Sequence, residues 1–310
     1  MSELKALEVV GLSKSFGAVK ALKNFDLAIE PGCFFGLLGP NGAGKSTFMS
    51  IISGFIRHDE GSVTLFGEPL NPDAPEQKKL IGLAPQNIAL YKDLTAEANL
   101  SLFAKLQGLH GAGLKARVDE ALDLAQLQDR RKSLVKEFSG GMKRRLNIAV
   151  ALLHNPRVLL CDEPTVGVDP QSRNAIFDTL LKLKDQGMTV LYSTHYMEEA
   201  ERLCDRIGII DHGEILREGD LDTLLQELPD IDRISTRNGG FSAQTLADFG
   251  RFGELLKHNG SVHLKPSDSF RLSEFYRWVE GENMDARDFI IERPSLENLF
   301  LQLTGRDLRE

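Results

Sequence analysis

The sequence contains few cysteines and no excess of basic residues. Among its 310 residues are only three cysteines, Cys33, Cys161 and Cys204, and 37 basic residues stand against 45 acidic ones, a formal net charge of −8. The odd number and wide separation of the cysteines argue against a disulfide framework or a zinc ribbon. We expect all three to be small buried residues in a reducing compartment. The acidic balance argues against broad coating of nucleic acid, so we expect no nucleic-acid partner.

Long hydrophobic runs are also missing. Apolar runs such as Ile148–Leu153 and Val158–Cys161 are far shorter than the ~20 residues that cross a bilayer. The first residues, Met1–Lys5, lack the apolar core of a signal peptide. We therefore expect a chain that neither spans a membrane nor is secreted. Hydrophobic residues make up 42% and charged residues 26%, which is typical of a folded protein rather than a disordered one.

Strand and helix patterns alternate along most of the chain. Short apolar or alternating runs predict strands at 7–10, 25–29, 34–38, 62–66, 157–162 and 189–194, and a hairpin over 207–216. Periodic apolar residues predict a helix after Lys45 with Phe48, Ile51, Ile52 and Phe55 on one face, helices through most of 95–153 interrupted by a loop at 108–113, and helices over 172–184 and 197–203. This alternation predicts a parallel sheet with buried strands.

The chain changes character after about residue 221. Asn238-Gly239-Gly240 and Lys265–Asp268 are loop signals, and the remainder mixes short helix and strand patterns around the single tryptophan, Trp278. A length of 310 residues suggests about two domains at roughly 150 residues each. We therefore predict a first domain over 1–220 and a small α+β domain over 221–310.

A glycine-rich loop follows the predicted strand 34–38. Its residues, Gly39, Pro40, Asn41, Gly42, Ala43, Gly44, Lys45 and Ser46, fit the pattern G-x-x-x-x-G-K-[ST]. Glycines permit a tight loop whose backbone N–H groups form an anion nest, and the next helix adds its positive N-terminal end. In such a loop Lys45 reaches the β and γ phosphates and the Ser46 hydroxyl can ligate Mg²⁺. The loop predicts a nucleoside triphosphate site but does not identify the reaction.

Two carboxylates follow a buried strand. Asp162 and Glu163 stand at the end of the apolar run Val158–Cys161, and open parallel sheets bind ligands at the carboxyl ends of their strands. Asp162 suits Mg²⁺ coordination, and Glu163 can accept a proton from an attacking water. Two acids on a solvated loop would be the alternative interpretation of this pair alone. The neighbouring phosphate loop favours the functional one.

The segment Ser139-Gly140-Gly141 opens a further predicted helix. Ser139 is a good N-cap, and the first turn carries Lys143, Arg144 and Arg145. Three cations near a helix N-terminus oppose the helix dipole. Two explanations stay open from the residues: an anionic group or acidic neighbour lies nearby, or the cations form a solvated face.

Taken together, these motifs resemble the nucleotide-binding subunit of ATP-binding-cassette (ABC) transporters. The resemblance covers about residues 5–220 and includes, in order, the phosphate loop, Gln86, Ser139-Gly140-Gly141, Asp162-Glu163, Asp169 and His195. It is specific, because ordinary P-loop proteins lack the Ser-Gly-Gly motif between the loop and the acidic pair. The runs from Ser139 to Leu146 and from Gly167 to Pro170 are similar to the ABC-2 exporter group, although Phe138 and Met142 replace the usual Leu and Gln.

The resemblance implies ATP as substrate, Mg²⁺ as metal and a role for each matching residue. The implied nucleotide contacts are Phe16 (stacking on adenine), Gly39, Pro40, Asn41, Gly42, Ala43, Gly44, Lys45, Ser46, Thr47 (near the α phosphate), Gln86, Ser139, Gly140, Gly141 and Asp169 (at a dimer seam). The implied metal ligands are Ser46, Gln86 and Asp162. The implied catalytic residues are Glu163, which activates water, Lys45, and His195, which contacts the γ phosphate. An isolated Phe16 or His195 would otherwise be interpreted as a structural residue.

The resemblance also implies an architecture and partners. The fold would be α/β: a RecA-like P-loop NTPase core with an antiparallel β subdomain and a helical insertion over about 95–155, followed by the small α+β extension. One copy of each motif implies a homodimer or a dimer with a related ATPase subunit. A separate transmembrane permease would hold the chain at the inner face of the cell membrane. Leu90, Tyr91 and Leu94 are candidates for that contact, unless they pack internally.

Other function classes remain as alternatives. The implied function is an ATP-hydrolysing subunit that powers an ABC-2 type exporter of drugs, lipids or polysaccharides. A soluble ABC-type ATPase in DNA repair or translation is the first alternative, although the second cassette, coiled-coil insertion or basic extension usual there is not visible. An importer ATPase is another. A GTPase or a small-molecule kinase is a third, but the guanine-reading Asn-Lys-x-Asp motif is missing.

Overall fold

The protein divides into two compact units. The computed structural model describes residues 4–226, 228, 233–236, 242–258, 261–267 and 269–305. The first unit ends at Leu221 and the second begins at Asp222. None of the helices in the described residues combines the length and the apolarity that crossing a bilayer requires.

The first unit is built on a six-stranded sheet with the strand order β10-β9-β3-β8-β7-β6. These strands are β3 (Phe34–Leu38), β6 (Ile81–Ala84), β7 (Val158–Asp162), β8 (Thr189–Thr194), β9 (Arg206–Asp211) and β10 (Glu214–Gly219). Five of them run parallel, and β10 pairs antiparallel with β9. The predicted parallel sheet and the predicted hairpin are both confirmed.

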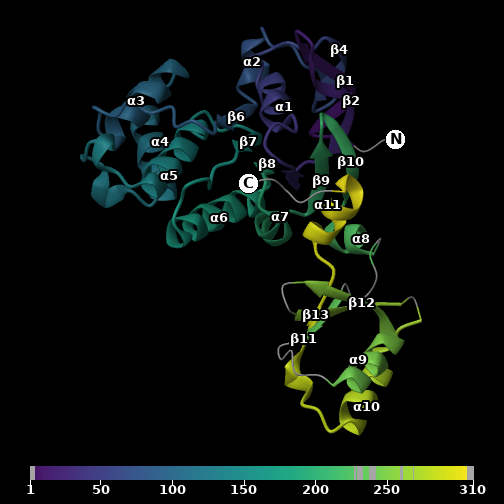
Figure 1. The fold of residues 1–310 in the computed structure, drawn as a ribbon. Coiled ribbons are helices and arrows are strands. Elements are labelled where there is room, and N and C mark those ends of the chain that lie inside the picture. The colour runs from purple at the N-terminus through teal and green to yellow at the C-terminus, as the bar shows by residue number, and fades with distance from the viewer. Residues whose placement is uncertain are drawn as a thin grey trace. The chain divides into compact units, whose positions relative to one another are not determined.

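Helices cover both faces of this sheet. The helices of the first unit are α1 (Lys45–Ile52), α2 (Pro75–Lys78), α3 (Ala96–Leu106), α4 (Gly111–Leu124), α5 (Gly140–Ala151), α6 (Pro170–Asp185) and α7 (Met197–Leu203), with 3₁₀ turns η1 (Gln128–Arg130) and η2 (Val135–Glu137). Successive side chains of a strand point to opposite faces. Accordingly, Phe35 of β3 packs with Phe48 of α1, whereas Phe34 packs with Phe177 of α6. Figure 1 shows α1 on one side of the central strands and α6 and α7 on the other.

A second, antiparallel sheet closes over α1. Its order is β2-β1-β4-β5, formed by β1 (Leu7–Phe16), β2 (Val19–Ile29), β4 (Glu60–Leu65) and β5 (Glu68–Pro69). Leu7, Phe25 and Val63 of these strands share one buried cluster with Phe48 and Ile52 of α1. The first helix is therefore fixed between two sheets, which holds the loop that precedes it.

Helices α3, α4 and α5 form the helical insertion (Figure 1). They pack on one another through a separate buried cluster that includes Leu100, Leu122, Phe138 and Leu146. Thr95 caps α3 by accepting a hydrogen bond from the N–H of Ala98 at 3.1 Å. The insertion is thus a small helical core of its own attached to the central sheet.

The second unit is a small α+β domain. Its antiparallel sheet has the order β12-β13-β11-β14, formed by β11 (Arg233–Thr236), β12 (Gly253–His258), β13 (Ser261–Pro266) and β14 (Phe289–Glu292). Its other elements are α8 (Leu221–Leu225, which begins at the boundary), α9 (Ala243–Phe249), η3 (Gly250–Phe252), α10 (Leu272–Gly281), η4 (Ala286–Asp288) and α11 (Leu296–Thr304). Aromatic residues form the core: Trp278 stacks on Phe249 with ring centres 5.8 Å apart, and Phe275 meets Phe289 edge-on at 5.2 Å.

Several predicted details were wrong. Phe55 is 74% exposed, because α1 already ends at Ile52 and the chain then turns. The predicted loop at 108–113 is shorter, since α4 begins at Gly111, and Lys265 and Pro266 belong to β13 rather than to a loop. Strands β1 and β2 are more than twice as long as predicted. The predicted loop residues 238–240 and 268 lie outside the described residues.

The cysteines behave mainly as predicted. All three are free thiols; Cys33 and Cys161 are buried and Cys204 is partly buried. Burial raises the pKa of the Cys33 thiol to about 11. At neutral pH Cys33 is therefore a protonated apolar side chain.

Candidate active site

The strand register brings the predicted site residues to one edge of the central sheet. Leu38, the last residue of β3, lies beside Thr194 of β8, and Asp162 of β7 lies beside Ser193 of β8. On the far side of β7, Ala84 of β6 pairs with Cys161. The phosphate loop, Gln86, the acidic pair and His195 all follow these strand ends. The carboxyl edge of an open parallel sheet is where such folds bind ligands.

Glycines of the phosphate loop occupy positions that no side chain fits. A Cβ at Gly39 would lie 2.2 Å from the backbone oxygen of Ile210. Gly44 has φ +114°, and a Cβ there would lie 2.6 Å from the oxygen of Ala21. Gly44 is also the N-cap of α1, whose first N–H groups have no partner within the helix. The loop therefore presents free helical donors at the positive end of a helix dipole, which is the physical basis of an anion site.

Lys45 and Glu163 form a buried ion pair at the centre of this edge. Lys45 Nζ lies 3.0 Å from Glu163 Oε1, and both side chains are about 95% buried, with 4% and 5% exposed. The ammonium also donates to the backbone oxygens of Gly39 at 2.7 Å and Pro40 at 3.0 Å. All three of its protons are thus directed to oxygens of this site.

The second oxygen of Glu163 meets two further predicted residues. Gln86 Nε2 donates to Glu163 Oε2 at 3.2 Å. His195 Nδ1 lies 3.3 Å from the same oxygen, although without the alignment of a hydrogen bond, and it has no hydrogen-bond partner in the part of the chain that the structure describes. Glu163 therefore stands at the point where Lys45, Gln86 and His195 converge. Its own backbone has φ 45°, a left-handed conformation that is uncommon for a residue with a side chain.

Ser193 links the two acids, and the sequence analysis missed it. Its hydroxyl donates to Asp162 Oδ1 at 2.6 Å and accepts from the N–H of Glu163 at 3.1 Å. Ser193 is fully buried and Asp162 is 7% exposed. The sequence signal for Ser193 was its position near the end of a predicted strand, two residues before His195.

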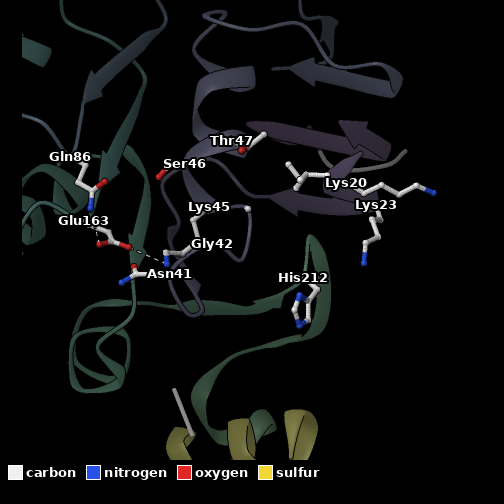
Figure 2. A pocket seen from close by; sticks show the side chains of 13 residues that line it. Lys20, Lys23, Asn41, Gly42, Lys45, Ser46, Thr47, Gln86, Glu163 and His212 are labelled. Atoms are coloured by element: carbon white, nitrogen blue, oxygen red, sulfur yellow. Dashed lines mark hydrogen bonds and ion pairs between the residues drawn. The ribbon is translucent and has the colours of Figure 1, made fainter. Parts of the chain in front are cut away.

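A cavity of about 510 Å³ opens over the phosphate loop (Figure 2). It is lined by Val19, Lys20, Ala21, Lys23, Asn41, Gly42, Gly44, Lys45, Ser46, Thr47, Gln86, Glu163 and His212. Figure 2 shows Lys20 and Lys23 on one side of the cavity and Glu163 with Gln86 on the other, with Lys45 between them. The size is within the range of about 300–1,000 Å³ typical of small-molecule sites. Three lysines make the cavity suitable for a polyanion.

Other residues of the predicted site lie around or away from this cavity. Pro40 and Ala43 of the loop are buried, and Asp162 is 7% exposed and is not among the residues that line the cavity. Phe16 is 51% exposed at the end of β1, where it pairs with the cavity-lining Val19. Lys14 Nζ lies 5.5 Å from the centre of the Phe16 ring. Phe16 is thus an exposed aromatic ring at the rim rather than a core residue.

The Ser139 motif caps α5. The Ser139 hydroxyl accepts a hydrogen bond from the N–H of Met142 at 3.2 Å, so the predicted N-cap is confirmed. Gly141 is buried against α6: a Cβ there would lie 2.2 Å from Ser172. Among the described residues that line the cavity over Lys45, the motif contributes none. A phosphate bound at Ser139 would therefore not lie in the cavity over Lys45 of the same chain.

Asp169 caps α6 in the same way. Its Oδ1 accepts from the N–H of Ser172 at 2.9 Å, and this hydrogen bond lowers the pKa of the exposed Asp169 carboxyl. Gly167, two residues before it, approaches the Ser139 motif: a Cβ at Gly140 would lie 3.6 Å from the Gly167 oxygen. The two capping motifs form one surface of the first unit.

Two of the three cations in α5 donate hydrogen bonds within the fold, and acidic neighbours lie close to both, as one of the two explanations predicted. Arg144 is 9% exposed and donates to the backbone oxygen of Gln86 and, at 3.4 Å, to that of Val166. Arg145 donates to the oxygen of Ala125 at 2.7 Å. Burial lowers the pKa of both guanidinium groups, and the charges of Asp162 and Glu163 partly offset this at Arg144. Carbonyl oxygens, rather than an anion, are their direct partners, and Arg144 ties α5 to the segment that carries Gln86.

Comparison with known proteins identifies the family. The sequence model of the ABC transporter family matches residues 22–166. The linearmycin resistance ATP-binding protein LnrL of Bacillus subtilis is 40% identical, with 98% of this chain and all of that protein covered. The chain belongs to the ABC transporter family. The Nod factor export ATP-binding protein I of Sinorhizobium fredii is 37% identical over 98% of this chain and 88% of its own length. The daunorubicin resistance ATP-binding protein DrrA3 of Streptomyces coeruleorubidus is also 37% identical, over 98% of this chain and 97% of its own.

Solved structures of ABC ATPase cassettes are similar to this chain. The dimeric structure of the ATP-binding cassette MJ0796, in a post-hydrolysis state with ADP and phosphate, is 32% identical, with a TM-score of 0.63 over 69% of this chain and 98% of that one. The CbiO1 subunit of Clostridium perfringens has a TM-score of 0.65 at 26% identity, over 70% of this chain and 89% of that one. The predicted fold class, an α/β P-loop NTPase core, is confirmed.

The family membership fixes the general function. This ABC protein is the ATP-binding, ATP-hydrolysing subunit of an exporter of ABC-2 type. Cassettes of this family dimerise and work with a transmembrane permease. The alternatives of a soluble ATPase in DNA repair or translation, and of an importer ATPase, are not favoured by these relatives.

Proposed function

We propose that the cavity over the phosphate loop holds the triphosphate of ATP and that Glu163 is the group that activates water. The observation that carries the proposal is the convergence of Lys45, Gln86 and His195 on the Glu163 carboxylate. A bound phosphate would compete with Glu163 for Lys45. The loop amides and the α1 N-terminus supply further donors to the phosphates, with Thr47 nearer to the α phosphate.

The residues around Lys45 also suit Mg²⁺. Ser46, Gln86 and Asp162 offer a hydroxyl, an amide oxygen and a carboxylate, and hard cations prefer oxygen ligands. Gln86 directs its amide nitrogen to Glu163, and Asp162 accepts the Ser193 proton with Oδ1, which leaves one side-chain oxygen on each for an ion. Bound there, Mg²⁺ would neutralise charge on the phosphates. No cluster of three or more His, Cys, Asp or Glu side chains suited to a metal occurs in the described residues, so water and phosphate would complete the ligand set.

Hydrolysis needs a base, an orienting group and a closed site. Glu163 would take the proton of the attacking water, and His195 would contact the γ phosphate from the other side. Ser139, Gly140 and Gly141 would contact the ATP held by a second cassette, with Asp169 at the seam. Phe16 would stack on adenine at the rim. We propose that two copies of this chain, or one copy and a related ATPase subunit, form this closed pair.

The work of hydrolysis would be transmitted to a separate permease. Tyr91 is 55% exposed beside Phe103 in the segment after Gln86, and Leu90 and Leu94 are partly buried, so Tyr91 is the strongest of the three permease-contact candidates. Such a contact would place the chain at the cytoplasmic face of the membrane. Since similar chains are named for linearmycin resistance, daunorubicin resistance and Nod factor export, we propose drugs, lipids or polysaccharides as the cargo class.

Two substitutions test the roles of Glu163 and Lys45. Glu163→Gln keeps the size and one acceptor oxygen but cannot take a proton, and it removes the charge that competes for Lys45. We therefore expect ATP binding to stay at least as tight and turnover to fall by about 10²–10⁴-fold. Lys45→Ala removes a cation from the phosphates, so we expect ATP affinity weaker by about ten- to a hundredfold. Displacement of a fluorescent ATP analogue measures affinity, and phosphate release with Mg²⁺ measures turnover.

Glu198→Gln is the matched control. Glu198 is an exposed acid of α7 and should leave both measurements unchanged. Normal turnover in the Glu163→Gln variant would remove Glu163 from the mechanism. Unchanged ATP affinity in the Lys45→Ala variant would show that the cavity over the phosphate loop is not the ATP site.

A further inference from the structure

Glu199 in α7 is a further buried carboxylate, and it is hydrogen-bonded to residues next to the candidate site. Glu199 is only 2% exposed. Its Oε1 accepts from Thr165 Oγ1 at 2.7 Å, and its Oε2 accepts from Thr194 Oγ1 at 2.7 Å and from the Tyr192 hydroxyl at 2.9 Å. Arg173 Nε of α6 is 3.8 Å from Oε1. One side chain thus receives three hydroxyl donors from two separate chain segments.

Those segments are the ones that carry the proposed base and the proposed phosphate-contacting histidine. Thr165 stands two residues after Glu163, and Thr194 stands immediately before His195. His195 Nδ1 and Glu163 Oε2 are 3.3 Å apart but not hydrogen-bonded to each other. The backbone on either side therefore sets their separation. Ser193 joins the two segments at the N–H of Glu163, and Glu199 adds a second connection through Thr165 and Thr194.

We propose that Glu199 is a positioning residue, which fixes Glu163 and His195 relative to each other by holding Thr165 and Thr194. The inference rests on the proposed function of the site. Glu199 does not line the cavity among the described residues, so it acts through the two threonines and not on ATP itself.

The chemistry of the pocket favours this role over simple core filling. A buried carboxylate is costly unless it is paired and hydrogen-bonded, and an apolar side chain of similar volume would fill the space without that cost. Burial, reinforced by the charge of Glu199, raises the pKa of Tyr192 well above its ordinary value, so its hydroxyl stays a donor. The N–H of Tyr196 also donates to Thr194 Oγ1 at 3.0 Å, which extends the network to the residue after His195.

The test compares Glu199→Gln with the exposed neighbour, Glu198→Gln, in the full-length chain. A glutamine has one acceptor oxygen, so at least one of the hydroxyls loses its acceptor. We expect the turnover number of the Glu199→Gln variant to fall by about 10–100-fold. ATP affinity, measured without Mg²⁺ by displacement of a fluorescent analogue, should stay within about threefold, because Lys45 and the phosphate loop are outside the network.

A second pair of variants covers the case in which Glu199→Gln folds poorly. Thr165→Val removes the hydroxyl at nearly constant volume, and Thr165→Ser keeps it. We expect Thr165→Val to lower turnover and Thr165→Ser to restore it, with thermal midpoints measured for all variants without nucleotide. Turnover should depend on whether residue 165 carries a hydroxyl group, and not on the thermal midpoint of the variant.

Three results would overturn the inference. They are a Glu199→Gln turnover equal to that of Glu198→Gln, a parallel loss of turnover and ATP affinity, or equal turnover in Thr165→Val and Thr165→Ser. An inactive wild-type chain would overturn the proposed function, and this inference with it. An active wild-type chain with an equally active Glu199→Gln variant would overturn the inference alone.

Discussion

The Lys45–Glu163 ion pair is buried, and in the proposed function it must still separate to admit a phosphate. A buried ion pair is costly to break on one side, because the remaining charge stays buried and unpaired. Here Lys45 keeps two backbone carbonyls when Glu163 turns away, and Glu163 keeps Gln86. The pair can therefore separate to admit a phosphate without leaving either charge unsolvated. The left-handed backbone at Glu163, φ 45°, is a local strain of the kind that persists at functional sites.

His154 should make the stability of the first unit sensitive to pH. Burial lowers the pKa of His154 below its ordinary value of 6.5, although its Nε2 donates to the oxygen of Ile81 at 2.9 Å. Below pH 6.5 the unfolded chain binds a proton that the folded chain does not. The free energy of unfolding should therefore decrease as the pH falls from 7.5 to 5.5. One such proton accounts for at most about 1.4 kcal/mol per pH unit.

His154→Gln isolates this effect. Glutamine keeps an N–H donor for Ile81 but does not titrate in this range, so the decrease should be smaller than in the wild-type chain. Urea unfolding followed by circular dichroism at both pH values measures the difference. Equal decreases in the two proteins would show that His154 takes up its proton equally well in the folded state.

At the scale of elements, α5 connects the helical insertion to the rest of the first unit. Arg144 donates to the Gln86 backbone, and Gly141 lets α5 approach the first turn of α6. The helix therefore depends on close packing at the very end that carries the Ser139 motif. Of the three cations near its N-terminus, Arg144 and Arg145 lie beyond the first turn, and both donate to backbone oxygens of neighbouring segments, which makes them compatible with the helix dipole.

Two neighbouring glycines of α5 should respond oppositely to alanine. A Cβ at Gly141 would lie 2.2 Å from both Cβ and Oγ of Ser172, so Gly141→Ala should destabilise the protein by about 1–2 kcal/mol. A Cβ at Gly140 meets only the Gly167 oxygen at 3.6 Å, so Gly140→Ala should stabilise the helix by up to about 1 kcal/mol. Urea unfolding measures both values, and equal shifts of the same sign would contradict the packing argument.

Elements were predictable where one local pattern decided them. Strand β8 and helix α7 have the predicted limits, since an apolar run and a short helical pattern meet at the turn of His195. Strand β6 was missed, because four residues without a turn signal resemble many other segments. Strands β1 and β2 extend beyond their apolar cores through exposed residues, which pair by backbone hydrogen bonds that leave little trace in the sequence.

In the candidate site, too, residues that belong to a local sequence pattern were predictable, and residues fixed by distant contacts were not. Lys45 was identified from the fixed spacing of a phosphate loop and Glu163 from its place after a buried strand, whereas Gln86 was implied by the resemblance to ABC ATPases. Ser193 and Glu199 were not identified, because each has a hydrogen-bond partner about thirty residues away in the chain. Contacts of that kind depend on register and packing, which the motifs do not encode.

At the scale of the whole molecule, the two halves of the proposed nucleotide site lie on different surfaces of the first unit. Lys45 and Glu163 line the cavity over the phosphate loop, whereas Ser139 and Asp169 cap α5 and α6 on another surface and do not line that cavity among the described residues. A complete site of the proposed kind therefore needs a second cassette. The second unit, residues 222–307, holds its own aromatic core.

Pairing should be visible when hydrolysis is blocked. In the Glu163→Gln variant bound ATP would stay intact, so its phosphates would bridge the loop of one copy and the Ser139 motif of the other. With ATP and Mg²⁺ the variant should therefore elute at about twice the chain mass of 34.4 kDa, and without ATP at the chain mass. Light scattering coupled to size-exclusion chromatography measures this mass.

The double variant Lys45→Ala, Glu163→Gln is the control and should stay at the chain mass because it lacks the phosphate-binding ammonium. A Glu163→Gln chain that binds ATP but keeps the chain mass at every concentration would contradict a homodimer and leave pairing with a related ATPase subunit.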